Sequence, residues 1–363
     1  MPGLGQHRFR YLVVGLLSTG LLSIGSALAW ADEAVTIDFI RHGETAANAQ
    51  GIIDTKPPGY PLDSTGITQA QYLANPDNPQ QLLSPDSYAG IYASDEFRTL
   101  ETAQDWLAAA GAPDTTVTQL SGLNEIPAGI FNGYPDDSLE GILYILSPIA
   151  WTFGLDLVPE LGDPSVNGVT FDESFGGAVQ TIYDNTIALS TNPTDAAFSS
   201  EGAIAVWTLM NVNNPDFAVV LKQILETGQF LPNTGQVVVE GSPGDWTLVS
   251  YDGTAVPQNP GLPTELFVDF RNLIEAPQFA GYNIFEALLS HDPSTILSAL
   301  EAGVTEVGKA IIQFPISVFE DIIHALTGGA TSLGTEVSAA ATDVAGLLPG
   351  DLGAMVGEAL AAL

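Results

Sequence analysis

The sequence predicts an α/β fold: a mainly parallel sheet with helices on both faces, followed by a C-terminal helical extension. Two observations carry this prediction. Short apolar segments alternate with helical segments between residues 32 and 260, which is typical of parallel strands joined by helices. Beyond residue 260 the chain is rich in Ala, Gly and Leu at helical spacing. We therefore expect a domain at 32–260 and an extension at 261–363.

The elements of the expected domain differ in how their apolar residues are spaced. Residues 35–40 are short and almost entirely apolar, as a buried parallel strand is. Around 241–245 the sequence Gly-Ser-Pro-Gly-Asp indicates a hairpin turn. The expected strands are residues 35–40, 90–93, 196–198, 236–240 and 247–251. The expected helices are residues 99–110 and the apolar stretch through 204–210. The loop at 258–263 marks the domain boundary.

The extension carries an apolar stripe at helical spacing, formed by Ile316, Phe319, Ile323 and Leu326. Pro315 precedes this stripe, where a proline suits the first turn of a helix. No uninterrupted apolar run in the extension is long enough to span a membrane. We expect a helical extension packed on the sheet domain. The alternative is a segment that docks a protein partner or associates with the cell envelope.

Residues 1–31 have the layout of a secretory signal peptide. Arg8 and Arg10 form a basic start, residues 11–28 are apolar, and Ala29-Trp30-Ala31 is a small-residue cleavage site. The sequence therefore predicts a secreted or cell-envelope protein. The alternative is an uncleaved membrane anchor, because the apolar run approaches the ~18–20 residues that can span a bilayer.

The charge balance excludes several classes of partner and site. The chain has 43 Asp and Glu against 8 Lys and Arg, a formal net charge of -35. Nucleic acids and anionic lipids require a basic face, so they are not expected as main partners. The chain has no cysteine, which excludes disulfides, thiolate catalysis and Cys-ligated metal sites. The 45% hydrophobic content argues against intrinsic disorder.

Directly after the expected strand at 35–40 comes a short motif that fits oxyanion chemistry, Arg41-His42-Gly43-Glu44-Thr45, followed by Asn48. Ligands bind at the carboxyl ends of strands in open α/β sheets. Arg41 offers a planar fork for phosphate oxygens, and a neutral His42 can attack phosphorus. Gly43 would let the backbone approach an oxyanion, and a following helix would direct its amides there.

Three further segments support this motif in chain order: PLDSTGITQA at 61–70, SDEFRTLETA at 94–103, and a Leu-x-Glu…Gly-x-x-x-Gly pattern within 123–133. Together with the strand and the Arg-His-Gly-Glu-Thr sequence, this ordered set resembles the histidine phosphatase superfamily, in its phosphoglycerate-mutase-like branch. The resemblance covers roughly residues 35–256. It implies the doubly covered sheet described above.

The resemblance also implies roles for individual residues. His42 would be the nucleophile that forms a phosphohistidine, and Glu125 the proton donor to the leaving alcohol. Arg41, Asn48 and Arg98 would bind the phosphoryl group. A proton donor must be protonated when attack begins, so we expect the pKa of Glu125 to be raised. The implied mechanism uses no metal and no cofactor.

One corner of the expected site departs from the family pattern. The family places a second histidine after a later strand, and alignment of Phe198-Ser199 and 202–204 puts Ser200 at that position. Ser200 can donate one hydrogen bond but carries no charge, and Glu201, if it pointed inward, would repel phosphate. Loss of one preorganised donor can cost about 2.7–4 kcal/mol in the transition state.

Two other histidines are weak substitutes for the missing one. His291 is followed by Asp292, as in the acid-phosphatase branch of the family, but it follows a helical stretch at 285–289 and comes after the hairpin. We expect a solvated residue at a helix end. His324 lies among the apolar stripe residues and is expected to be a surface or packing residue.

Three hypotheses for function follow. The first is an exported phosphomonoester hydrolase that acts on a small phosphorylated substrate through a phosphohistidine. The second is a catalytically impaired pseudo-phosphatase that binds a phosphorylated ligand or a protein partner at the cell envelope. The third is an envelope-associated structural protein whose tail, residues 261–363, supplies the function. Aromatic residues within 136–185 would favour an apolar or neutral leaving group.

Overall fold

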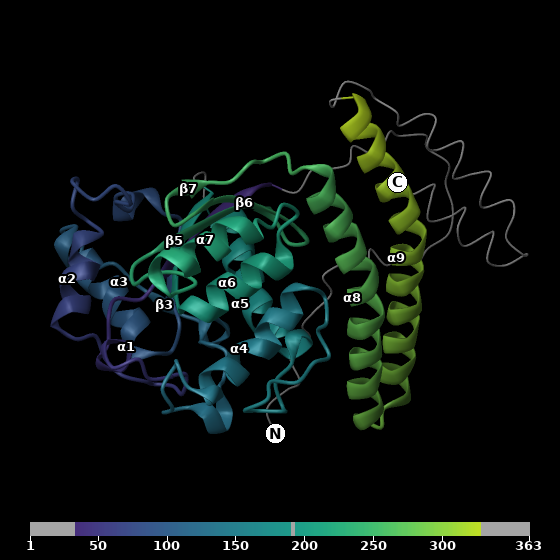
Figure 1. The fold of residues 1–363 in the computed structure, drawn as a ribbon, viewed down its shortest axis with the longest axis horizontal. Helices are drawn as coiled ribbons and strands as arrows, with labels where there is room; N and C mark the ends of the chain where they lie inside the picture. The colour runs from purple at the N-terminus through teal and green to yellow at the C-terminus, as the bar shows by residue number, and fades with distance from the viewer. Residues whose placement is uncertain (1–32, 190–192, 328–363) are drawn as a thin grey trace, which may run out of the picture. The chain divides into compact units, whose positions relative to one another are not determined.

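The computed structural model describes residues 33–189 and 193–327, and these form two compact units (Figure 1). The first unit contains the described residues up to Thr152 together with Pro159–Gln258. The second contains Phe153–Val158 and the described residues from Asn259 onward. The expected signal peptide, residues 1–31, lies outside the described residues, so cleavage and anchoring stay predictions.

The first unit is built on a sheet that has seven strands within the described residues. Four neighbouring strands, β3, β2, β4 and β1, are mutually parallel, and β5, β6 and β7 continue the sheet antiparallel. The predicted fold class is confirmed, with the parallel strands at one side of a mixed sheet. The strands in sheet order are β3 (Thr118–Gln119), β2 (Ile91–Ala93), β4 (Thr194–Ser199), β1 (Val35–Arg41), β5 (Gln236–Ser242), β6 (Asp245–Tyr251) and β7 (Thr254–Ala255).

The hairpin of β5 and β6 is tighter than the sequence indicates. Ser242 pairs with Asp245, so the strands extend into the segment expected to be the turn. Only Pro243 and Gly244 remain between them, and Gly244 adopts a positive φ of 88°. A left-handed backbone at this position favours glycine because it has no Cβ.

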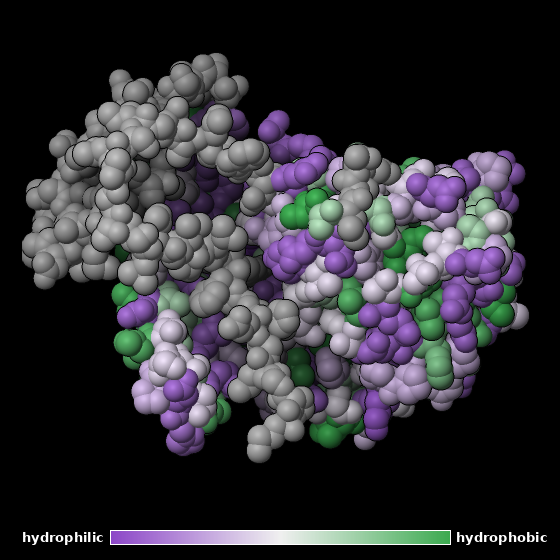
Figure 2. Space-filling model, turned by 180° about the vertical axis from the view of Figure 1, so that it is seen from behind, coloured by the Kyte–Doolittle hydropathy of each residue, from purple (hydrophilic) through white to green (hydrophobic). Residues whose placement is uncertain are grey.

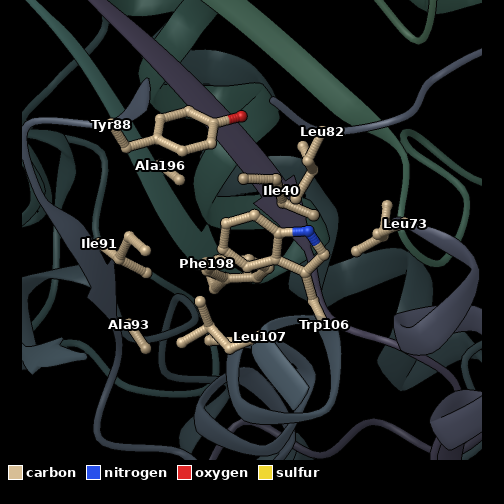
Figure 3. Close-up of a cluster of buried hydrophobic side chains, with 11 residues drawn as sticks. Ile40, Leu73, Leu82, Tyr88, Ile91, Ala93, Trp106, Leu107, Ala196 and Phe198 are labelled. Atoms are coloured by element: carbon tan, nitrogen blue, oxygen red, sulfur yellow. The ribbon is translucent and has the colours of Figure 1, made fainter. Parts of the chain in front are cut away.

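Helices cover both faces of the sheet. On one face, Trp106 of α3 packs on Ile40 and Phe198 of the central strands (Figure 3). On the other, Phe39 packs against Phe175 of α5 and Trp207 of α6. Successive residues of a strand point to opposite faces, so Phe39 and Ile40 anchor the two layers from one strand. The helices are α1 (Ala46–Ala49), α2 (Ser64–Tyr72), α3 (Phe97–Ala109), α4 (Leu139–Thr152), α5 (Gly168–Leu189), α6 (Glu201–Asn211) and α7 (Phe217–Thr227), with short 3-10 turns η1 (Pro85–Ser87), η2 (Ser121–Leu123) and η3 (Gly129–Phe131).

The second unit contains two long helices, α8 (Leu262–Leu289) and α9 (Pro293–Thr327), which pack side by side (Figure 1). The expectation that a helix starts at Pro315 is wrong, because Pro315 lies inside α9. The helix begins at Pro293, where the side chain of Asp292 accepts a hydrogen bond from the backbone N–H of Thr295 at 3.2 Å. An acidic cap followed by proline is a strong start signal. Among the described residues, no helix is both long and apolar enough to cross a membrane.

The surface carries many large apolar side chains. Figure 2 shows apolar and polar areas interleaved over the described residues on one face of the molecule. Ile130 and Leu139 are 74% and 66% exposed in the first unit, and Leu326 is 76% exposed in the second. Only 14% of the residues are charged against 45% hydrophobic, so charged side chains alone cannot cover the surface.

Candidate active site

The four parallel strands bring the predicted site residues to one edge of the sheet. His42 follows β1, Arg98 follows β2, Glu125 follows β3 and Ser200 follows β4. Residue Arg41 pairs with Ser199 across β1 and β4, and the backbone N–H of His42 donates to the Ser199 carbonyl at 3.1 Å. The carboxyl edge of parallel strands is the usual ligand site of an open α/β sheet.

His42 is held in one orientation in a buried position. The side chain is 3% exposed, and Nδ1 lies 2.7 Å from the carbonyl oxygen of Gly43. A carbonyl can only accept, so Nδ1 donates and the lone pair of the neutral ring is at Nε2. Burial lowers the pKa of His42 well below its usual value, and the charges of Arg98 and Arg41 lower it further. The imidazole is therefore neutral at neutral pH, the form in which Nε2 is a nucleophile.

Gly43 serves a different purpose from the one the sequence indicates. Its backbone N–H donates to the Thr102 hydroxyl at 2.9 Å and is not free for an oxyanion. A Cβ at this position would lie 2.6 Å from the carbonyl oxygen of Gly66, so close backbone packing requires glycine. The following helix, α1, has four residues, and the Thr45 hydroxyl caps the N–H of Asn48. The oxyanion role expected for the Gly43 amide is not supported, because that N–H is already bonded. The role expected for the amides of α1 stays a prediction.

Asn48 closes the N-terminus of α1. Its side-chain oxygen accepts from the backbone N–H and from the hydroxyl of Thr45, both at 3.1 Å. The Thr45 hydroxyl in turn accepts from the backbone N–H of Asn48 at 3.2 Å. This capping box fixes the loop that follows His42. The substrate-binding role expected for Asn48 stays a prediction.

Arg98, at the start of α3, lies at the centre of a buried polar network. Its guanidinium donates to Glu96 at 2.7 Å, to Asp54 at 3.3 Å and to the hydroxyl of Ser200 at 3.1 and 3.3 Å. Ser200 is the N-cap residue of α6, but its hydroxyl makes no capping bond and donates to Glu96 at 3.1 Å. Ser200 therefore lies beside the predicted phosphate-binding arginine.

Arg41, at the end of β1, is also paired with a carboxylate. One nitrogen of its guanidinium, Nη1, lies 2.8 Å from Glu201 and 3.1 Å from the side-chain oxygen of Gln229, and it donates to the carbonyl of Leu231. Its buried Nε has no hydrogen-bond partner among the described residues. Glu201 therefore points at the predicted phosphate-binding cation, and an incoming oxyanion would compete with it.

Glu125 caps the start of α6 in place of the Ser200 side chain. Its carboxylate accepts from the backbone N–H groups of Ile126, Gly202 and Ala203 at 2.9, 3.1 and 2.8 Å. Burial of the carboxyl raises its pKa; these backbone bonds and Arg98 act in the opposite direction. The expected upward shift of the pKa is confirmed. Its role as proton donor stays a prediction.

Sequence reasoning missed two acidic residues of this site, Glu96 and Asp54. Glu96 is fully buried between β2 and α3, two residues before Arg98, and burial raises its pKa to about 7. An acidic residue inside the expected 94–103 motif was a usable signal for Glu96. Asp54 lies 44 residues from Arg98 along the chain, and no sequence pattern connects the two.

The two other histidines that the structure describes, His291 and His324, lie in the second unit and are exposed, as expected. His291 lies between α8 and α9, with Nδ1 2.8 Å from the Leu289 carbonyl. His324 lies 3.4 Å from the carboxylate of Glu265. Within the described ranges, no group of three or more His, Asp and Glu side chains could hold a metal ion.

Comparison with known proteins gives a related sequence that matches most of this chain. The chain is 46% identical over 303 residues to the PE-PGRS family protein PE_PGRS11 of Mycobacterium tuberculosis (strain ATCC 25618 / H37Rv). The match covers 81% of this chain and 49% of that protein. The chain thus spans about half the length of the curated relative it matches.

Solved structures with a similar arrangement include phosphatases and a mutase. A phosphoserine phosphatase mutant from Entamoeba histolytica, in complex with phosphoserine, is 24% identical with a TM-score of 0.41, over 60% of this chain and 96% of that one. A phosphoglycerate mutase from Bacillus anthracis is 16% identical with a TM-score of 0.43, over 61% and 94%.

The family model of the histidine phosphatase superfamily (branch 1) matches residues 37–143. This segment begins in β1 and includes Arg41, His42, Arg98 and Glu125. Ser200 lies beyond it, so the departure expected at that corner stays a prediction. The segment 37–143 belongs to the histidine phosphatase superfamily, branch 1.

Proposed function

We propose that this chain is an exported phosphomonoester hydrolase that acts on a small phosphorylated substrate through a phosphohistidine intermediate. The observation that carries the proposal is the state of His42. The ring is buried, the charges of Arg98 and Arg41 help to lower its pKa, and Nδ1 is bound to the Gly43 carbonyl, which leaves Nε2 of the neutral imidazole for attack. The family assignment of residues 37–143 supports phosphoryl chemistry at this residue.

The proposed reaction has two steps. In the first, Nε2 of His42 attacks phosphorus, the bond from phosphorus to the leaving oxygen breaks, and Glu125 gives its proton to that oxygen. In the second, water attacks the phosphohistidine, the phosphorus–nitrogen bond breaks, and Glu125 takes a proton from the water. Arg41 and Arg98 hold the transferred group by charge-assisted hydrogen bonds.

Export is proposed from the signal-like segment, residues 1–31. Association with the cell envelope or with a protein partner through residues 261–363 is proposed as well. Fractionation of cells that express the whole chain, and a form ending at Pro263, tests both. We expect the whole chain outside the cytoplasm, with its amino terminus at Asp32. Retention of the whole chain in the cytoplasm would contradict the proposal.

A second candidate is a pseudo-phosphatase that binds a phosphorylated ligand without turning it over. The observation that favours it is the pairing of both arginines with carboxylates, Arg41 with Glu201 and Arg98 with Glu96. A phosphate group must displace or neutralise these carboxylates before it can bind both guanidinium groups. Ser200 adds no positive charge to offset them.

Turnover of a generic phosphomonoester by the purified protein separates the two candidates. The hydrolase predicts activity that His42→Ala lowers by more than about a thousandfold. The pseudo-phosphatase predicts equal background rates for wild type and variant, with phosphate binding retained in both. Thr68, an exposed residue of α2, offers a matched control: Thr68→Ala should leave the rate unchanged.

A further inference from the structure

The corner of the site beside Ser200 contains a carboxyl group that the reaction above does not use. Both oxygens of Glu96 are engaged there: Oε1 accepts from Arg98 at 2.7 Å, and Oε2 accepts from the Ser200 hydroxyl at 3.1 Å. The Ser94 hydroxyl lies 3.4 Å from the same Oε2. Glu96 is fully buried, so its oxygens have these groups in place of water.

An ionised Glu96 and a bound phosphoryl group need the same donors. Arg98 Nη2 and the Ser200 hydroxyl each contact the Glu96 carboxylate. Phosphoryl oxygens at these donors would lie next to a second anion in a buried space, where like charges repel strongly. A protonated Glu96 removes this repulsion, and its O–H becomes a hydrogen-bond donor. A neutral carboxylic acid in a buried site can serve as a donor in this way.

We propose that Glu96 completes the phosphate site at the corner of Ser200, and that the site takes up a phosphoryl group only while the Glu96 carboxyl carries its proton. The proton would turn Glu96 into a second hydrogen-bond donor beside Ser200. It would also remove the negative charge that Ser200, being neutral, cannot offset. The inference rests on the proposed function, because it assumes that Arg98 and His42 receive a phosphoryl group.

The surroundings of Glu96 make this proton available near neutral pH. Burial raises its pKa to about 7, Arg98 on α3 lowers it, and the carboxylates of Glu125 and Asp54 raise it. Tyr144 of α4 also faces this cluster, and burial raises its pKa well above the usual value, so it stays neutral. An anion bound at Arg98 would raise the Glu96 pKa further.

The sign of the pH dependence follows from these groups. Below about pH 7, Glu96 is protonated in the free site and anion affinity is at its maximum. Above that pH, the proton must be taken up on binding, so affinity falls by up to about tenfold for each pH unit. Removal of the titratable carboxyl should abolish this fall.

Sulfate binding measured by calorimetry between pH 6 and 9 tests the proposal, because sulfate remains a dianion throughout and does not titrate itself. Wild type should lose affinity as the pH rises and should take up a proton from the buffer at pH 8. Glu96→Gln, which mimics the neutral acid, should bind with nearly constant affinity and take up less proton. The matched control is Asp95→Asn, an exposed neighbour that should behave as wild type.

Glu96→Met provides a second variant, because apolar residues can replace buried charged groups of similar volume. It should also lose the pH-dependent fall, with weaker binding at pH 6 since it lacks a donor. A flat wild-type profile, or a fall that persists in both variants, overturns the role of Glu96 and leaves the hydrolase proposal standing if turnover depends on His42. No sulfate binding at any pH, together with no turnover, overturns both proposals.

Discussion

The two sides of the candidate site differ in how they handle charge. On the His42 side, a buried neutral ring is fixed by a single carbonyl, as a nucleophile requires. On the Ser200 side, the polar groups form a closed network in which Glu96 neutralises Arg98 and the hydroxyl of Ser200 bridges them. The proposed nucleophile is thus neutral and held by a single bond, while the two arginines proposed to hold the phosphate are already paired with carboxylates.

The largest effect on turnover is expected at Glu125. Glu125→Gln removes the proposed proton donor, and turnover should fall by about 10²–10⁴-fold. The amide also replaces one of the oxygens that cap α6, so the free energy of unfolding should fall by about 1 kcal/mol. Steady-state kinetics and thermal unfolding measure the two effects separately.

A matched control exists for the capping effect. Glu101 accepts a backbone hydrogen bond from Leu62 at 2.7 Å but has no proposed part in the reaction. Glu101→Gln should alter stability without altering turnover. If Glu125→Gln keeps wild-type turnover, another group protonates the leaving oxygen and the role assigned to Glu125 is wrong.

A smaller effect on turnover is expected at Ser200. Its sign tests whether the Ser200 side of the site lacks a positive charge. Ser200→His places a cationic donor beside Arg98, where it can offset Glu96, and turnover should rise by up to about a hundredfold. Ser200→Ala, which only removes the hydroxyl, is the control and should not raise turnover. A drop in turnover for Ser200→His would show that the family's second histidine does not correspond to this corner.

The smallest predicted effect concerns stability across the pH range. Burial raises the pKa of Asp38 and of Glu96 to about 7, and that of Asp195 to about 6, above their ordinary values. The folded state therefore binds more protons than the unfolded chain between about pH 4 and 7, and stability falls as the pH rises through this range. The formal net charge of -35 acts in the same direction by self-repulsion.

Thermal unfolding at a series of pH values at constant salt checks this expectation. The midpoint should be higher at pH 5 than at pH 8, and Asp38→Asn should reduce the difference. A midpoint that rises from pH 5 to pH 8 would mean that these carboxyls are stabilised as anions in the folded state.

Much of the fold could be predicted from the sequence because its signals are local. The apolar run at 35–40 is a buried central strand, and the motifs that carry Arg41, Arg98 and Glu125 each follow a parallel strand. The helix start expected at Pro315 is wrong because the apolar stripe that follows this residue belongs to α9, which already begins after the cap at Asp292.

The electrostatics of the site could not be predicted in the same way. The pairing of Arg41 with Glu201 joins the end of β1 to the start of α6, 160 positions apart, and it depends on how α6 is placed. Glu96 is close to Arg98 in sequence, but its full burial depends on packing that no local pattern encodes. Long-range pairing and burial are properties of the folded chain.

The central claim is that His42 carries the phosphoryl group during turnover. Rapid quenching of the protein with a phosphomonoester labelled in its phosphate, under the alkaline conditions in which phosphohistidine survives, tests it most directly. We expect label on the peptide that contains His42 in wild type and none in His42→Ala. Turnover without label on His42, or label that persists in the variant, would contradict it.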